Sequence, residues 1–211
     1  MTSSPRQRTA TRSSRSGARD ATCRPDRAGT VAGVKATRSI DQDTGELEVH
    51  TGVAGRSARL GHRLVLAARS WQAVVQLDDE RPVALTVTVR AGSLEVTSGE
   101  GGLTPLSAPE RAVATANAHR SLQVKKYPAI EFRSDSIEPS ENGFRVRGGL
   151  TICGAERPCE FPLDYEAGAP APTLAVAVPV RQTDFGVKPF SLMMGTLQVA
   201  DEVTVVARAT V

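Results

Sequence analysis

Apolar and polar side chains alternate along most of this chain of 211 residues. The clearest run spans residues 83–90, in which Leu85, Val87 and Val89 share one face and polar side chains occupy the other. A period of two is typical of a strand with one buried face and one solvated face, as in antiparallel sheets. The pattern therefore predicts an all-β fold.

Segments of the same kind are separated by the Gly, Pro, Asn, Ser and Asp residues that turns require. They predict strands at residues 47–50, 62–66, 72–77, 83–90, 130–137, 143–153, 159–166, 173–181 and 199–211. One segment differs, because Ser107 stands three residues before Glu110 and Pro109 lies between them. This is the signature of a capped helix start, and it predicts one short helix over 108–120. Many short strands favour a barrel or a sandwich, and a barrel leaves no exposed edge.

Residues 1–40 differ in composition from the rest of the chain. They hold nine basic and two acidic side chains and little that could be buried. Low hydrophobicity predicts a disordered basic tail over 1–40, followed by one folded domain over 41–211. Three other interpretations of the tail remain open: an arm that contacts acidic polymers, a transit peptide, and a later translation start. The domain itself carries 17 basic and 21 acidic side chains, so we expect no nucleic-acid partner for it.

Compartment follows from what the chain lacks. No run approaches the roughly 20 apolar residues of a membrane-spanning helix, and the first 30 residues contain no apolar stretch of a secretory signal. The three cysteines, Cys23, Cys153 and Cys159, are few and odd in number, which favours free thiols. Alternation also places Cys153 and Cys159 on opposite faces, where they would not pair. We therefore expect a cytoplasmic protein without a transmembrane segment.

Catalytic signatures are absent. The chain contains no phosphate-binding glycine loop, no zinc-protease motif and no nucleophile elbow. Its histidines, His50, His62 and His119, are scattered without ligand spacing, so we expect neither a metal nor another cofactor. His62 stands at a strand start, where it either hydrogen-bonds locally or lines the mouth of a cavity.

Five motifs follow one another in a recognisable order. They are Leu60-Gly61-His62, Ser93-Leu94-Glu95-Val96, Lys125-Lys126-Tyr127-Pro128-Ala129-Ile130-Glu131-Phe132, Gly148-Gly149-Leu150-Thr151-Ile152, and Arg181-Gln182-Thr183-Asp184-Phe185-Gly186-Val187-Lys188-Pro189-Phe190-Ser191. Together they resemble the YceI-like family over residues 47–211. The chain departs from that pattern at Trp71-Gln72-Ala73, which stands where the Phe-x-Gly-x-Phe style of early strand motif would have a glycine.

The resemblance implies an eight-stranded antiparallel lipocalin-like β-barrel with one inserted short helix, preceded here by the disordered N-terminal tail. It also implies binding of a long polyisoprenoid chain inside the barrel. Many bacterial members of the family are secreted, whereas this chain shows no signal peptide. The candidate lipid-binding residues come from the expected cavity mouth, from alternation and from the apolar loop 185–195: His62, Leu64, Leu66, Leu85, Val87, Val89, Ile130, Phe132, Leu150, Ile152, Phe161, Phe185, Phe190 and Met193.

Three functional hypotheses follow. The first is non-enzymatic storage or transport of a long apolar lipid, such as an isoprenoid quinone, with any polar head near His62, Arg181 or Asp184. The second is an enzyme that acts on such a lipid with His62 as acid or base. The third is a barrel with a filled core that binds a partner, which an internal cavity below about 100 Å³ would support. The sequence leaves open whether the chain forms a homodimer.

Overall fold

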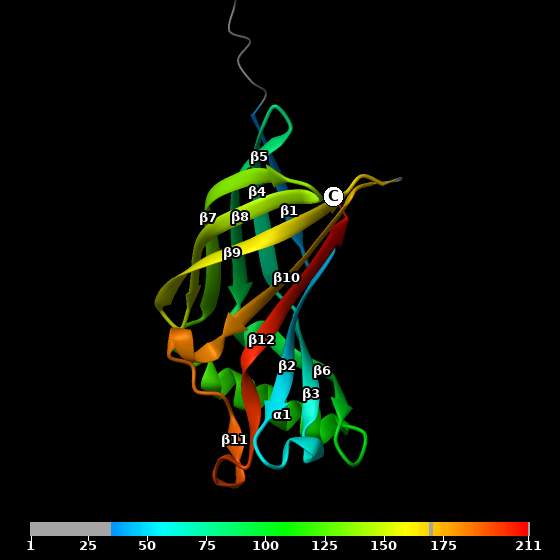
Figure 1. Ribbon diagram of the computed structural model, residues 1–211, viewed down its shortest axis with the longest axis vertical. Coiled ribbons are helices and arrows are strands. Elements are labelled where there is room, and N and C mark those ends of the chain that lie inside the picture. Colours follow the sequence, from blue (N-terminus) through cyan, green and yellow to red (C-terminus); the bar gives the residue numbers. More distant parts are fainter. Residues whose placement is uncertain (1–34, 169–170, 211) are drawn as a thin grey trace, which may run out of the picture. The chain divides into compact units, whose positions relative to one another are not determined.

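The alternating segments form one antiparallel sheet (Figure 1). The computed structural model describes residues 35–168 and 171–210, all within the unit Gly33–Val211. The strands are β1 (Lys35–Asp41), β2 (Gly45–Ala54), β3 (His62–Ala68), β4 (Trp71–Asp78), β5 (Arg81–Arg90), β6 (Leu94–Gly101), β7 (Ala129–Ser140), β8 (Gly143–Ile152), β9 (Ala155–Glu166), β10 (Thr173–Arg181), β11 (Ser191–Leu192) and β12 (Leu197–Thr210). The helices are α1 (Ala108–Ser121) and the short 3₁₀ turns η1 (Ala58–Leu60), η2 (Ala91–Ser93), η3 (Gln182–Phe185) and η4 (Met193–Gly195).

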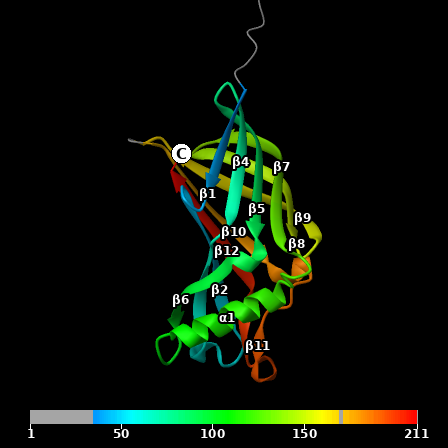
Figure 2. The ribbon, with the colours of Figure 1, turned by 180° about the vertical axis from the view of Figure 1, so that it is seen from behind.

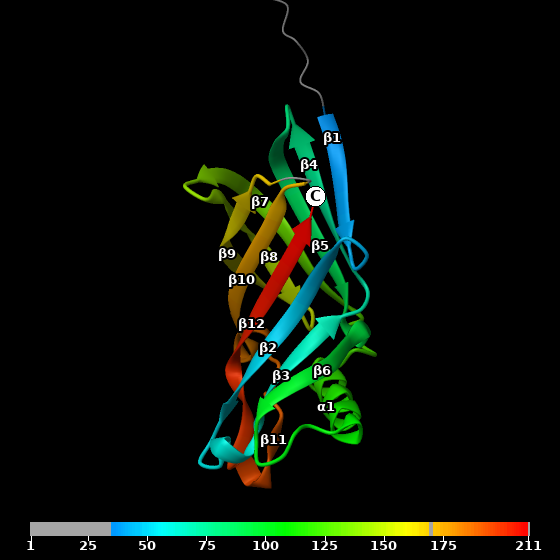
Figure 3. The same ribbon diagram turned by 90° about the vertical axis from the view of Figure 1, so that its right-hand side faces the viewer.

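The sheet follows the order β1-β4-β5-β7-β8-β9-β10-β12-β2-β3-β6, with β11 beside β12. Figure 3 shows β12, β2, β3 and β6 side by side as the sheet curls into a half-barrel. The prediction of a closed, eight-stranded barrel is wrong. The described residues form twelve strands, and β1 and β6, at the two ends of the order, do not pair with each other.

Two bends explain part of the larger strand count. Strands β3 and β4 form one arm of a long hairpin, and β5 and β6 form the other arm. A bend divides each arm, so that β4 pairs with β5 and β3 pairs with β6. The bends face each other: the amide of Arg69 donates to the oxygen of Ser93 at 3.1 Å, and the amide of Arg90 donates to that of Ser70 at 3.0 Å. The hydroxyl of Ser93 also accepts from the amide of Ser70 at 3.0 Å, which holds the two bends together.

Strand β1, apart from Asp41, lies inside the predicted tail. It pairs with β4 from Lys35 opposite Asp78 to Asp41 opposite Gln72, although only Ile40 among its side chains is buried. Backbone pairing at the sheet edge therefore forms this strand without an alternating pattern that could predict it. Residues 35–40 thus belong to the sheet, whereas the predicted disorder of residues 1–34 concerns a segment outside the described residues.

Helix α1 confirms the predicted helix. Glu110 accepts a hydrogen bond from the amide of Ser107 at 2.7 Å, and the Ser107 hydroxyl accepts one from the amide of Glu110 at 3.4 Å, so both halves of the capping box form. The helix lies along β6 (Figure 2). None of its side chains is fully buried, so α1 covers the sheet rather than forming part of a solid core. Neither α1 nor any other described helix is long and apolar enough to cross a membrane.

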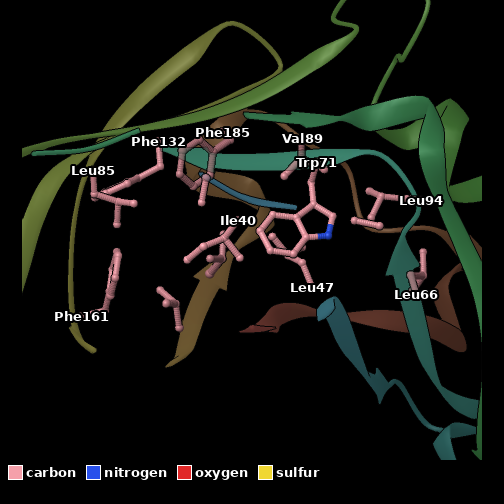
Figure 4. Close-up of a cluster of buried hydrophobic side chains, with 14 of the residues drawn as sticks. Ile40, Leu47, Leu66, Trp71, Leu85, Val89, Leu94, Phe132, Phe161 and Phe185 are labelled. Atoms are coloured by element: carbon pink, nitrogen blue, oxygen red, sulfur yellow. The ribbon is translucent and has the colours of Figure 1, made fainter. Parts of the chain in front are cut away.

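Although Phe185 and Val187 come from the connection after β10, most of the buried side chains come from the inward faces of the strands (Figure 4). Leu85 and Val89 are among them, as the alternation of residues 83–90 predicts. The rings of Phe132 and Phe161 pack at a tilt of 56° with their centroids 5.1 Å apart, and aliphatic residues make up most of the rest. No polar or charged residue among those described is classed as buried. The interior of the curled sheet is therefore almost wholly apolar.

Candidate functional site

A cavity of about 680 Å³ lies inside the curled sheet. Every described strand contributes at least one lining residue, and α1 contributes two rows of them. Ligand pockets usually measure several hundred Å³, so this volume is that of a binding site rather than of a packing defect. The interior is therefore not the filled core that the third hypothesis requires.

The cavity is long. On β12 its lining residues extend from Leu197 to Ala209. At a rise of about 3.3 Å per residue, these positions lie roughly 40 Å apart along the strand. A volume of about 680 Å³ spread over such a length describes a narrow channel, which suits a thin, extended ligand better than a compact one.

The structure brings together the residues that alternation predicts. Leu85, Phe132 and Phe161 lie around one stretch of the interior (Figure 4). The predicted residues that line the cavity are His62, Leu64, Leu66, Leu85, Val87, Val89, Ile130, Phe132, Leu150, Ile152, Phe161, Phe185 and Phe190. Met193, the remaining predicted residue, lies in η4, and its side chain is outside the described part of the structure.

Helix α1 supplies lining residues that the sequence reasoning missed. Two rows of side chains at i, i+4 spacing face the cavity. They are Pro109, Val113, Asn117 and Ser121 in one row, and Glu110, Ala114, Ala118 and Leu122 in the other. The helical period of these residues was a usable signal, but the helix is so rich in alanine that it shows no strong apolar stripe.

The apolar loop near the C-terminus closes part of the channel. Phe185 and Val187 are buried, and Gly186 adopts a positive φ of 71° that favours glycine between them. The side chain of Asp201 fixes the loop from β12: it accepts from the Thr183 amide at 2.9 Å and from the Thr183 hydroxyl at 2.7 Å. These two hydrogen bonds lower the pKa of Asp201 below its ordinary value.

Two polar residues predicted at the mouth lie elsewhere. Arg181 and Asp184 are exposed and do not line the cavity. The guanidinium of Arg181 faces outward, 3.9 Å from the carboxylate of Asp201. Alternation along β10 explains this, because its buried neighbour Val180 takes the inward position. Gln182, which does line the cavity, donates its amide to the oxygen of Ala200 at 2.9 Å.

His62 is the first residue of β3 and lines the cavity near one end. Its Nε2 donates to the main-chain oxygen of Thr104 at 2.8 Å. A side chain on Gly102 would collide with the imidazole, so the glycine allows the loop to pack against the ring. This hydrogen bond joins His62 to the β6–α1 connection, 42 residues away in the sequence, and is not a local one, whereas the expected place in the cavity lining is confirmed. No cluster of three metal-ligating side chains occurs in the described ranges, at His62 or elsewhere.

Glu110 is the one acidic residue among the described residues that line the channel. Its carboxylate accepts hydrogen bonds from the hydroxyl and the amide of Ser107, and these lower its pKa below the ordinary value, with a smaller contribution from His62. The carboxylate is thereby engaged in the helix cap. His62 bonds to Thr104 and Glu110 bonds to Ser107, so these two residues do not form the mutually hydrogen-bonded pair that acid–base catalysis by two groups requires.

Cys153 and Cys159 are free thiols. Cys159 lies opposite Gly148 in the ladder between β8 and β9 and lines the cavity, whereas Cys153 occupies the turn after β8 and donates its S–H to the oxygen of Leu122 at 3.2 Å. Burial raises the pKa of both thiols. Cys23 lies outside the described residues.

The channel opens at one end of the sheet. Its solvent-exposed apolar lining residues are Leu60 in η1, Pro109 and Val113 on α1, and Leu192 on β11. These elements lie together at the lower end of the molecule in Figures 1 and 3. Leu192 pairs with Leu197, and Gly61 approaches Leu197 closely enough that a Cβ there would lie 2.8 Å from its Cδ1. We call the surface around this opening, made of residues 55–63, 100–113 and 191–196, the rim.

The family model and the structure of one known protein agree with this architecture. The model of the YceI-like domain matches residues 30–211. The crystal structure of Burkholderia cenocepacia BcnA superposes with a TM-score of 0.62 at 17% identity, covering 79% of this chain and 96% of that one. The Campylobacter jejuni YCEI protein gives a TM-score of 0.46 at 12% identity, covering 82% and 83%. Comparison with curated protein sequences gave no match. Because the family model spans most of the chain, this protein belongs to the YceI-like family.

Proposed function

We propose that this protein binds one long apolar lipid inside the channel, a polyisoprenoid such as a prenyl chain or the tail of an isoprenoid quinone, and stores or transports it without changing it chemically. The observation that carries the proposal is the channel itself, which has a volume of about 680 Å³ and a lining that extends for roughly 40 Å along β12. Membership of the YceI-like family supports a polyisoprenoid ligand, because the resemblance to that family implies binding of such a chain inside the barrel.

The chemistry of the lining supports a hydrocarbon ligand. Around its middle the channel presents side chains such as Leu85, Phe132 and Val178, none of which carries a polar group. Burial of apolar ligand surface contributes roughly 25 cal/mol per Å², from which the cost of ordering the chain must be subtracted. A long hydrocarbon buries enough surface to offset that cost, whereas a compact polar molecule would lose hydrogen bonds to water without replacement.

The polar lining residues support an opening that accepts the polar end of a lipid, rather than a catalytic centre. His62 and Thr51 lie at the open end, together with Gln198 of β12. The Nε2 of His62 already donates to Thr104, so its remaining nitrogen is the free position. Such groups favour a ligand whose hydroxyl, carbonyl or quinone oxygen lies at the open end of the channel.

Native mass spectrometry of the chain purified from its own host tests the proposal. We expect a mass increment of a single co-purifying lipid per chain, which organic extraction removes and a prenyl quinone restores. A chain that carries no lipid and takes up no prenyl quinone would contradict the proposal. The variant His62→Ala separates binding from catalysis: it should retain uptake, and lipid recovered from both proteins should be chemically unchanged.

A further inference from the structure

We propose that the rim docks reversibly on an anionic lipid bilayer, so that lipid passes between the membrane and the channel. The proposal rests on the proposed function, because a bilayer is where a long apolar lipid resides. Docking is nevertheless a separate property of the surface and can be measured without a bound lipid.

Exposed apolar side chains gather at the rim. Leu60, Val113 and Leu192 line the opening and are each about half exposed. Leu103, 82% exposed, and Met194, fully exposed, stand on the adjacent β6–α1 and β11–β12 connections. Five of the seven exposed large apolar residues described in the structure thus lie at this end. A concentration of that kind on the surface marks an interaction site.

The charges of the rim favour a negatively charged partner. Arg56 and Arg59 are exposed on the turn that contains η1, and within the described part of the chain neither forms an ion pair. The acidic groups nearby are engaged: Glu100 pairs with Arg63 at 3.4 Å, and Glu110 is bound within the helix cap. The free charge at the opening is therefore positive, although residues 41–211 carry a net negative charge overall.

The turns of the rim are held close to one another. The amide of Ser57 donates to the oxygen of Thr196 at 2.9 Å, which ties the turn carrying Arg56 and Arg59 to the one carrying Met194. The oxygen of Thr104, next to Leu103, accepts from His62. The turns of the rim carry apolar side chains with arginines beside them, and this arrangement matches the boundary of a bilayer, where acyl chains lie below anionic phosphates. Because few groups take part, the association should be weak and reversible, as carriage of a lipid requires.

Flotation with lipid vesicles tests the proposal. Full-length chains are compared, so that the seven arginines of residues 1–34 contribute equally to every sample. The wild type should float with vesicles of phosphatidylcholine and phosphatidylglycerol and bind much more weakly to vesicles of phosphatidylcholine alone. Replacing both arginines, Arg56→Ala with Arg59→Ala, should lower the partition coefficient about 30-fold. Replacing the two most exposed apolar residues of the rim, Leu103→Ser with Met194→Ser, should lower the partition coefficient at least about 10-fold.

The opposite end of the sheet provides a matched control. Arg81 and the half-exposed Val83 lie at the β4–β5 hairpin, far from the rim in Figure 1. The pair Arg81→Ala with Val83→Ser removes one cation and one apolar side chain, and it should leave vesicle binding unchanged. Equal vesicle binding by the wild type and both rim variants, or equal loss in the control pair, would overturn the proposal. So would a stable dimer in sedimentation that is lost in the rim variants, because a second copy would then cover this surface.

Lipid transfer distinguishes failure of docking from failure of the proposed function. The rim variants should take up a prenyl quinone from detergent micelles as the wild type does but acquire it more slowly from anionic vesicles. If no variant and no wild-type chain acquires lipid from either source while vesicle binding still depends on the rim, docking stands and the proposed lipid ligand fails. Equal rates of transfer from vesicles in all chains would count against docking.

Discussion

The imidazole Nε2 of His119, on α1, donates to the main-chain oxygen of Leu94, on β6, at 2.8 Å. Four residues earlier on the same helix face, the hydroxyl of Thr115 accepts from the amide of Val96 at 3.0 Å. Side chains of the helix thus satisfy backbone groups on the free edge of β6, where a strand would otherwise pair. The same helix lines the channel, so its attachment to β6 also closes the channel wall.

The variant Thr115→Val should loosen this attachment, because it leaves the partly buried amide of Val96 without an acceptor. We expect a loss of about 1 kcal/mol in the free energy of unfolding, or roughly 2–4 °C in the melting temperature. Bound lipid should also dissociate faster, since the wall opens more often. Calorimetry and a lipid-release assay measure the two effects. Ala116→Ser, an exposed change on the same helix, serves as control, and equal behaviour of the two variants would contradict the role of Thr115.

The variant Ala207→Phe should fill the channel without straining the fold. Ala207 lies on β12, pairs with Leu47 and Val176, and faces the cavity. Overpacking of a filled core costs about 1–3 kcal/mol, whereas a ring placed in an empty channel should leave the unfolding free energy unchanged or higher. Lipid uptake should fall sharply. The neighbouring outward change Ala177→Phe should affect neither property. A large loss of stability in Ala207→Phe with normal lipid uptake would argue that the interior is filled.

The thiol of Cys159 should report occupancy of the channel. Thiolate is the species that alkylating reagents attack, and burial raises the pKa of Cys159, so alkylation near neutral pH should be slow and should accelerate as the pH rises. In a chain with Cys23→Ser and Cys153→Ser, a bound lipid should slow the reaction further, about 10-fold or more, because it occupies the space beside the thiol. Mass spectrometry follows the adduct. Equal alkylation rates with and without lipid would place the ligand elsewhere.

The helix cap should make stability depend on pH in the acid range. Hydrogen bonds from Ser107 hold the pKa of Glu110 below its ordinary value of 4.5. A carboxyl with a depressed pKa stabilises the folded state fully above its ordinary pKa and loses that contribution as the pH falls through its folded value. The melting temperature of Ser107→Ala should therefore lie below that of the wild type at pH 6, with a difference that narrows as the pH falls below about 4.5. Ser140→Ala, an exposed change in a hairpin, should show a difference that does not vary with pH.

The inward face of the sheet could be predicted from the sequence because burial and strand period act together. Alternation placed Leu64, Leu85 and Phe132 inside, and they line the channel. The spacing of Ser107 and Glu110 likewise predicted α1, since the capping box involves only neighbouring residues. These features depend on contacts that are local or repeat along one strand.

Features that depend on pairing between distant segments could not be predicted. The polar strand β1 forms because its backbone pairs with β4, and no alternation reveals that. The bends at Ser70 and Ser93 divide long strands only because they face each other. Whether the inward residues fill a core or line a channel depends on the curvature of the sheet, which alternation along a single strand does not encode.

Fluorescence of Trp71 during titration with prenyl quinones tests the central claim most directly. Trp71 is the one tryptophan of the chain; it is buried and lines the channel (Figure 4). Its emission should be quenched to saturation by a single quinone per chain. The affinity should rise with the length of the prenyl tail, because each buried CH₂ contributes about 0.8 kcal/mol. Quenching should be lost in Ala207→Phe. Quenching that does not saturate, or that is equal for quinones with long and short tails, would contradict a channel that binds one long apolar lipid.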